Sequence, residues 1–238
     1  MSRAAVPARE RLIFAMDVPT PDVARRLADQ LGDSVSFYKL GLELFMSGGA
    51  FELLDGLVGR GKKIFLDLKL FDVPATVAGA VRNLRNRGIT FATVHGNQAI
   101  MEAAAQAADG VGILAVTVLT SLDRGDLDDL GFQVDVEALV LSRARRALEA
   151  GCAGVISSGL EAKVLRAGVD DRLIVVTPGI RPVENRPADD QKRVVGVADA
   201  FANGADYIVV GRPIRDAADP RAAAEAIQST IAGLFPGR

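Results

Sequence analysis

The sequence predicts a single domain, spanning residues 1–238, with the α/β fold of a (β/α)8 barrel, or TIM barrel. Short apolar segments of strand length alternate with helical segments along the whole chain. Eight strand–helix units fit into 238 residues, which suits this barrel. No linker, low-complexity tract or change of composition divides the chain. Doubly wound sheets also alternate strands with helices, but eight units in this length favour the barrel.

The expected strands are short apolar runs, each followed by residues that begin a turn or a helix. They cover Arg11–Asp17, Ser34–Gly41, Lys62–Leu70, Thr90–His95, Val111–Val118, Ala153–Ser157, Leu173–Thr177 and Ala205–Val210. Prolines open several of the helices between them, and glycines such as Gly88 end them.

The expected helices occupy most of the remaining chain. The first opens at Pro19–Pro21 and runs to about Leu31, and the second follows the strand that ends at Gly41 and runs to Arg60 with an interruption at Gly48–Gly49. The next three cover Asp72–Arg87, Asn97–Ala108 and Val134–Ala150. A sixth follows the strand that ends at Ser157 and runs to about Ala167, a seventh ends at Asn203–Gly204, and the last covers Pro220–Leu234. Two longer connections, Leu119–Gln133 and Pro178–Asp190, are expected to be loops.

The third strand concentrates the polar chemistry of the chain. In the segment Ile64–Thr76 (IFLDLKLFDVPAT) leucines alternate with Asp67 and Lys69, so the two charged side chains share one face. Burying two opposite charges costs free energy of desolvation, so such a pair on a buried face suggests that the protein uses it in its function. Asp72 follows at the carboxyl end of the strand, where α/β barrels have their active sites. This strand therefore predicts the catalytic centre.

Composition narrows the classes of protein and partner. The net charge is −2 with no basic stripe, so we expect no nucleic-acid partner. Apolar runs such as Tyr207–Val210 are far shorter than the roughly 20 residues of a membrane-spanning helix. The amino terminus lacks the apolar core of a signal peptide, and Cys152 is the only cysteine, so we expect a cytoplasmic protein. The chain has 22 arginines and 6 lysines, and Lys39 and Lys69 are the two lysines within apolar strand patterns, which suggests a need for a side chain that can release a proton.

Other strand ends carry a second group of polar residues. Two segments, Thr177–Pro182 and Val209–Ile214, each pair a glycine with an arginine after the seventh and eighth strands, where such barrels often bind phosphate. Glycine lets backbone N–H groups approach an anion, and arginine binds phosphate through several donors. We therefore expect an anionic group to bind between these two segments.

Several motifs resemble those of the orotidine 5′-phosphate decarboxylase family. The run Asp67–Thr76 matches the pattern D-x-K-x-x-D-[IV]-P-x-T of that family. The agreement continues, in the same order along the chain, through Lys39–Gly41, Thr117–Ser121, Pro178–Pro182, Asp190–Arg193 and Gly211–Pro213.

The resemblance implies a homodimeric enzyme that decarboxylates orotidine 5′-monophosphate to uridine 5′-monophosphate, the last step of de novo UMP synthesis, without cofactor or metal. Lys69 would protonate C6 of the pyrimidine, in a charged network with Asp67 and Lys39. Asp72 and Thr76 would enter the site from the partner subunit. The implied substrate-binding residues are Asp17 and Lys39 at the ribose, Thr120 at the pyrimidine, Arg181, Gln191, Gly211 and Arg212 at the phosphate, and Ser121 and Pro178.

Two other functions remain as alternatives. One is a metal-dependent sugar-phosphate decarboxylase or aldolase of the same superfamily, against which Pro74, Thr76 and the run Asp190–Arg193 speak. The other is a nucleotide-binding barrel without catalytic activity, against which the retention of all four charged residues, Lys39, Asp67, Lys69 and Asp72, speaks.

Several residues also have purely structural interpretations. Asp67 and Lys69 could form an ion pair that only packs in the barrel, and Asp72 could cap the following helix. His95 could act as a general base, although a lone histidine at a strand end is more often structural. Cys152 is expected to be a small core residue. The acidic cluster Asp123–Asp129 lacks the spacing of a calcium loop and is interpreted as a solvated loop.

Overall fold

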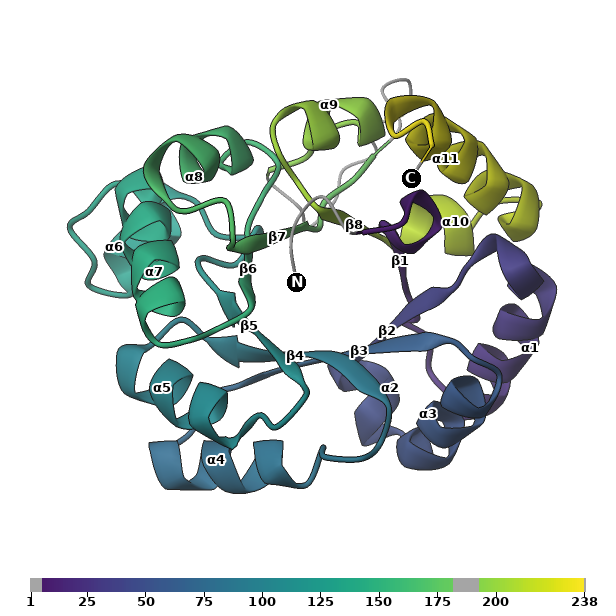
Figure 1. The fold of residues 1–238 in the computed structure, drawn as a ribbon, viewed down its shortest axis with the longest axis horizontal. Helices are drawn as coiled ribbons and strands as arrows, with labels where there is room; N and C mark the ends of the chain where they lie inside the picture. The colour runs from purple at the N-terminus through teal and green to yellow at the C-terminus, as the bar shows by residue number, and fades with distance from the viewer. Residues whose placement is uncertain (1–5, 182–192, 238) are drawn as a thin grey trace.

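The computed structural model describes residues 6–181 and 193–237, and in it eight parallel strands close into a barrel in chain order. Figure 1 looks along this barrel, with the strands forming a ring inside the helices. The strands are β1 (Leu12–Ala15), β2 (Phe37–Gly41), β3 (Lys63–Leu70), β4 (Ile89–His95), β5 (Gly112–Val116), β6 (Gly154–Ile156), β7 (Ile174–Thr177) and β8 (Tyr207–Val210). The predicted (β/α)8 barrel is confirmed.

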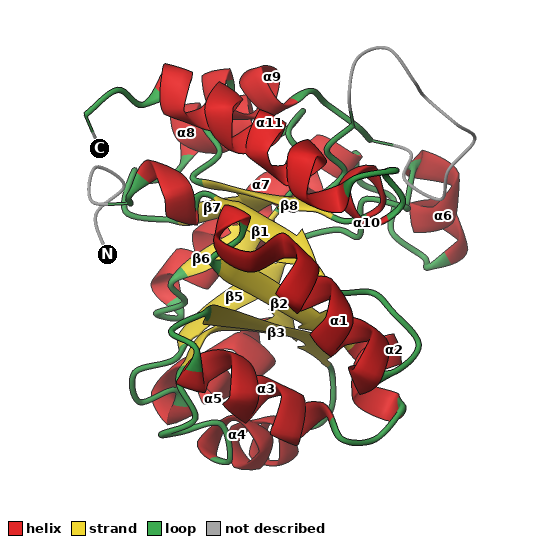
Figure 2. Ribbon diagram, turned by 90° about the vertical axis from the view of Figure 1, so that its right-hand side faces the viewer, coloured by secondary structure: helices red, strands yellow, loops and turns green. Residues whose placement is uncertain are grey.

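Helices cover the outside of the barrel, as the side view in Figure 2 shows. They are α1 (Pro21–Leu31), α2 (Leu42–Met46), α3 (Ala50–Gly59), α4 (Pro74–Arg82), α5 (Gln98–Ala107), α6 (Arg124–Asp129), α7 (Val136–Glu149), α8 (Ala162–Gly168), α9 (Val197–Ala202), α10 (Arg212–Arg215) and α11 (Pro220–Leu234), with short 3₁₀ turns η2 (Ala8–Glu10) and η3 (Gly32–Ser34). Within the described ranges, no helix has the length and apolar composition to cross a membrane.

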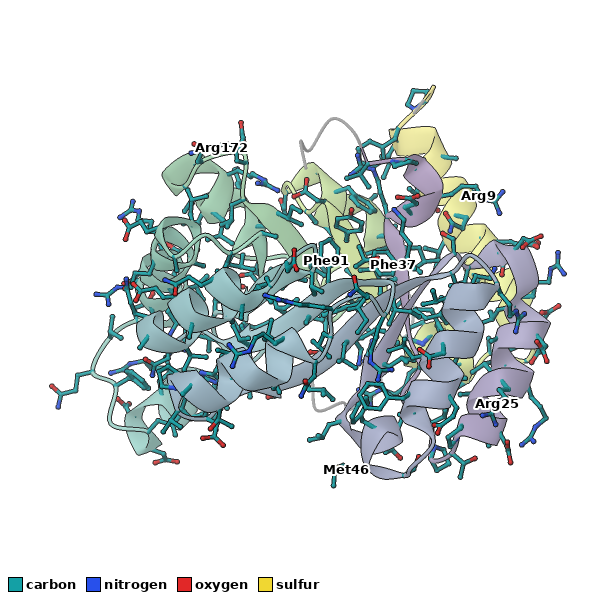
Figure 3. The ribbon with its side chains drawn as sticks, turned by 60° about the horizontal axis from the view of Figure 1, so that its bottom comes forward. Arg9, Arg25, Phe37, Met46, Phe91 and Arg172 are labelled. Atoms are coloured by element: carbon teal, nitrogen blue, oxygen red, sulfur yellow. The ribbon has the colours of Figure 1, made fainter. Side chains whose placement is uncertain are left out.

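Alternation along the strands divides the apolar residues into two layers. One face of the strands fills the barrel, where the rings of Phe37 and Phe91 stack with centroids 5.7 Å apart and Tyr207 packs edge-on against both. Figure 3 shows Phe37 and Phe91 together in the middle of the molecule. The other face, with Leu12 and Phe14 as examples, packs with the helices. Burial on both faces explains why most strands are apolar throughout.

The structure differs from the sequence-based expectation mainly in the connections. Most strands are a residue or more shorter than expected, and the helix expected over Asp72–Arg87 covers only Pro74–Arg82. The connection expected to be a loop, Leu119–Gln133, contains α6. Asp123 starts this helix because its side chain accepts hydrogen bonds from the N–H groups of Gly125 and Asp126. The interpretation of the acidic cluster as a loop was therefore wrong.

Candidate active site

A cavity of about 430 Å³ opens at the carboxyl ends of the strands. Its lining comes from residues at or after the ends of β1, β2, β3, β5, β6, β7 and β8. The polar and glycine lining residues, with one proline, are Asp17, Lys39, Asp67, Lys69, Thr120, Ser121, Pro178, Gly179, Arg181, Gly211, Arg212 and Arg215. This volume and this mixture of charged and apolar walls are typical of a small-molecule site.

Four charged side chains from three neighbouring strands form a network on one side of the cavity. The Lys69 ammonium lies 2.9 Å from both carboxylate oxygens of Asp67. The Lys39 ammonium lies 2.8 Å from Oδ1 of Asp17 and 3.4 Å from Oδ2 of Asp67. The charges therefore alternate in sign from Asp17 through Lys39 and Asp67 to Lys69.

Burial and pairing act in opposite directions on the two innermost charges. The side chains of Lys39 and Asp67 are each only 10% exposed, and burial by itself disfavours both ionised forms. Against that burial, Lys39 and Lys69 hold the pKa of Asp67 below its ordinary value. For Lys39, the charges of Asp67 and Asp17 likewise outweigh burial and raise its pKa. Both groups therefore stay charged at neutral pH, and each depends on the other.

The backbone at Lys69 has an unusual conformation. Its φ is +48°, in the left-handed region that costs an L-residue roughly 1–2 kcal/mol. The register between β3 and β4 passes from Leu66–Ala92 to Leu70–Val94, so β3 is bulged around Lys69. Strain held at one polar side chain inside a cavity is a feature of functional sites. Sequence alternation predicted the shared face of Asp67 and Lys69, but not this bulge.

Both glycine–arginine segments contribute residues to the lining of the same cavity. Arg181 follows β7, and Arg212 follows β8, and both line the cavity with Gly179 and Gly211. Gly179 has a φ of +75°, which an L-side chain adopts with strain, so glycine is required at this turn. The two arginines in the lining bring to the cavity positive charge of the kind that binds phosphate.

Two of the predicted site residues, Asp72 and Thr76, do not line this cavity. Asp72 and Thr76 are exposed on the connection that follows β3 and on the first turn of α4. Asp72 accepts a hydrogen bond from the N–H of Val73, but Val73 is itself the N-cap residue of α4, so Asp72 does not have the capping role that the sequence left open. Gln191 lies outside the described residues.

Two contributors to the site were missed at the sequence level. Arg215 lines the cavity and donates a hydrogen bond of 2.7 Å to the backbone carbonyl of Asp17. Thr93 on β4 contacts both Lys69 and Asp67 beneath the cavity. Arg215 lies three residues after Arg212, so a second arginine close behind the Gly211–Arg212 pair could have indicated it. A threonine within an apolar strand, such as Thr93, gives no comparable signal.

The remaining candidates have structural surroundings. His95 packs against Phe71, with ring centroids 4.7 Å apart, and does not line the cavity. Cys152 is buried, which raises the pKa of its thiol to about 12, and it packs in the core as expected. Over residues 6–181 and 193–237, no three His, Cys, Asp or Glu side chains gather as they would around a metal ion.

Comparisons with known proteins agree with this geometry. The sequence matches the orotidine 5′-phosphate decarboxylase / HUMPS family over residues 10–227. It is 65% identical over 235 residues to an orotidine 5′-phosphate decarboxylase of Methylococcus capsulatus, covering 99% of this chain and 97% of that protein. It is 52% identical over 240 residues to one of Xanthomonas euvesicatoria, covering 99% and 98%. The crystal structure of such a decarboxylase from Lactobacillus acidophilus aligns with a TM-score of 0.82 at 35% identity, covering 93% of this chain and 99% of that one. The chain therefore belongs to the orotidine 5′-phosphate decarboxylase / HUMPS family of enzymes.

Proposed function

We propose that this enzyme converts orotidine 5′-monophosphate to uridine 5′-monophosphate and CO₂, the last step of de novo UMP synthesis, in the cytoplasm and without metal or cofactor. The observation that carries the proposal is one cavity whose lining combines the Lys39–Asp67–Lys69 network with two arginines, Arg181 and Arg212. A nucleoside monophosphate has the matching chemistry, because its reacting base and its phosphate are separated by the ribose.

The proposed reaction begins with cleavage of the bond between C6 and its carboxylate. The electron pair stays on C6, CO₂ leaves, and the Lys69 ammonium donates a proton to C6. Lys69 is then a neutral amine until it takes a proton from solvent. Because C6 has no attached electron sink, the developing negative charge must be stabilised by a preorganised cation nearby. The Asp67 carboxylate, 2.9 Å from that ammonium, orients it and repels the substrate carboxylate.

The other lining residues would hold the nucleotide. Asp17 and Lys39 are proposed to bind the ribose hydroxyls. Thr120, Ser121 and Pro178 are proposed to bind the pyrimidine, and Arg181, Gln191, Gly211 and Arg212 the phosphate. Phosphate binding, remote from the bond that breaks, would supply energy for assembling the catalytic arrangement.

A homodimer with shared active sites completes the proposal. Asp72 and Thr76 are exposed at the rim of the barrel, outside the cavity of their own chain. Large apolar side chains are exposed on the neighbouring connections: Leu42, Met46, Phe71 and Val73 are each more than 60% exposed. Figure 3 shows Met46 pointing away from the molecule at this end. An exposed apolar group of this kind is typical of a protein interface, and a partner packed there would cover these side chains and bring its own Asp72 and Thr76 to the cavity.

An ultraviolet assay tests this function. Purified protein is mixed with orotidine 5′-monophosphate, and the loss of the orotate absorbance is followed with and without EDTA. We expect turnover at the same rate in both. Activity that disappears in EDTA and returns with Mg²⁺ would instead favour a metal-dependent sugar-phosphate lyase. Nucleotide binding with no turnover would favour a non-catalytic barrel.

A further inference from the structure

The hydroxyl of Thr93 lies between the two central groups of the site. Its Oγ1 is 2.9 Å from the backbone nitrogen of Lys69 and 2.9 Å from Oδ1 of Asp67. Thr93 is only 1% exposed and does not line the cavity. A bound substrate therefore does not contact it, and any effect on catalysis passes through Lys69 and Asp67.

The directions of these two hydrogen bonds follow from the donors available. A backbone N–H can only donate, so the Thr93 hydroxyl accepts from Lys69. Its single proton is then donated to the Asp67 carboxylate, which when ionised can only accept. One hydroxyl thus pairs the N–H of the half-buried Lys69 and orients the buried Asp67 carboxylate at the same time. Valine has the same shape but can do neither.

Thr93 also compensates for the break in the sheet. The paired register passes directly from Leu66–Ala92 to Leu70–Val94, and Lys69 lies within the bulge with its left-handed φ of +48°. Its N–H finds an acceptor in the side chain of Thr93, which lies between Ala92 and Val94 on β4. The hydroxyl therefore takes the place of a backbone carbonyl at the bulge.

We propose that Thr93 is a positioning residue, whose hydroxyl fixes the Lys69 backbone in its left-handed conformation and turns the Asp67 carboxylate toward both lysines. The inference rests on the proposed function for the reaction that Lys69 performs. Charged and polar groups from each neighbouring strand meet Asp67: Lys39 from β2, Lys69 from β3 itself and Thr93 from β4, with Asp17 beyond Lys39. Of these, Thr93 is the one uncharged group, so it can be changed without altering the charge of the site.

Two substitutions separate the hydroxyl from the shape of the side chain. Thr93→Val removes the hydroxyl, and Thr93→Ser keeps it. We expect kcat for orotidine 5′-monophosphate to fall at least about tenfold in Thr93→Val while KM changes less than about threefold, because the ground-state contacts remain. Thr93→Ser should stay within about threefold of wild-type kcat.

Thr117→Val provides a matched control. Thr117 is fully buried and is not itself a lining residue, and its hydroxyl donates to the backbone carbonyl of Ile156 rather than to a member of the charged network. This variant loses a buried hydroxyl without disturbing Lys69 or Asp67, so its kcat should stay close to that of the wild type. Thermal unfolding of all the variants shows whether each is folded, and Thr93→Cys, with its weaker donor, replaces Thr93→Val in the comparison if the valine variant does not fold.

A substrate-free measurement separates this proposal from the proposed function. Carbon-13 NMR titration of the Asp67 carboxyl should give a higher midpoint in Thr93→Val than in wild type, Thr93→Ser or Thr117→Val, since a hydrogen bond to the charged form is lost. That comparison decides the role of Thr93 even if the wild type does not decarboxylate the nucleotide. A wild-type Asp67 titration in Thr93→Val, or equal kcat losses in Thr93→Val and Thr93→Ser, would overturn the proposal.

Discussion

Lys69 combines an unfavourable backbone conformation with a tightly paired side chain. Its left-handed φ costs roughly 1–2 kcal/mol, and its ammonium contacts both oxygens of Asp67. A lysine that was needed only for stability would not require this bulge, because an extended strand would pair it with Asp67 without strain. The conformation is therefore best explained by where it directs the ammonium, which is into the cavity.

Lys69→Ala tests that function directly. Removing a general acid typically costs about 10²–10⁴-fold, so kcat should fall by at least about 100-fold, with binding of uridine 5′-monophosphate largely retained. Lys69→Arg should fail as well, because guanidinium does not release its proton at neutral pH. Steady-state kinetics and calorimetric titration with the product measure the two quantities. A Lys69→Ala enzyme that keeps a tenth of wild-type kcat would remove Lys69 from the role of acid.

The Asp67 carboxylate should affect stability in acid. Burial opposes its ionisation, but Lys39 and Lys69 outweigh burial and lower its pKa. A lowered folded-state pKa adds stability that is present above the unfolded value of about 3.9 and is lost as pH falls through the folded-state pKa. The free energy of unfolding should therefore fall more steeply below about pH 4 in wild type than in Asp67→Asn. Urea unfolding at a series of acidic pH values gives both slopes, and equal slopes would contradict this account.

At the scale of the elements, sequence predicts the bounds of a helix best where a capping residue and a proline mark its first turn. The bounds expected for α1 and α11 are confirmed because Thr20 and Asp219 cap them and a proline occupies the first turn of each. The carboxyl end of α4 was placed too late. Its last turn is followed by irregular turns that include Asn86, at a φ of +60°, and local apolar pattern does not reveal where that change begins.

The same distinction applies to the site. The alternation of side chains along β3 predicted that Asp67 and Lys69 share a face, because this alternation depends on one strand alone. The bulge and the role of Thr93 depend on how β3 pairs with β4, 24 residues further along the chain from Lys69, so no local pattern shows them. Likewise, Arg215 on the short helix α10 lines the cavity and donates a hydrogen bond to the backbone carbonyl of Asp17. The two residues are 198 positions apart in the sequence, so no local pattern shows this contact.

Gly41, at the end of β2, controls how closely two of the charges approach. A Cβ added there would lie 2.8 Å from Oδ1 of Asp17 and 3.0 Å from the Lys39 ammonium. Its φ of −99° suits alanine, so Gly41→Ala should fold normally but displace the Asp17–Lys39 pair. If these residues bind the ribose, KM for the nucleotide should rise at least about tenfold, the effect of roughly 1.4 kcal/mol of lost binding.

Gly56→Ala is the control for this substitution. Gly56 lies within α3, and an added Cβ there meets no atom within 4 Å. Alanine should stabilise the helix by about 0.5–1 kcal/mol without changing KM. Kinetic titrations of both variants with orotidine 5′-monophosphate make the comparison. Equal KM values in Gly41→Ala and Gly56→Ala would show that the approach of Asp17 and Lys39 is not needed for binding.

At the scale of the whole molecule, the charged network and several exposed apolar side chains lie at or just after the ends of neighbouring strands. The network lines the cavity at the ends of β1, β2 and β3, while exposed apolar side chains follow β2 and β3. Asp72 lies on the connection between β3 and α4, beside the exposed Phe71 and Val73 and outside the cavity lining of its own chain. In the shared-site arrangement proposed above, this connection would contact the partner and carry Asp72 to the partner's cavity.

Mixing two inactive variants tests that arrangement. Lys69→Ala and Asp72→Ala should each lose activity alone, because every site lacks one of the two residues. In a hybrid dimer, one site carries both defects and the other carries neither, so an equal mixture that exchanges subunits fully should have about a quarter of its sites intact. Assays before and after exchange, with exchange verified by mass spectrometry of labelled subunits, measure the recovery. If Asp72 serves the site of its own chain, hybrid dimers contain one defect in each site, and activity would not return however completely the subunits exchange.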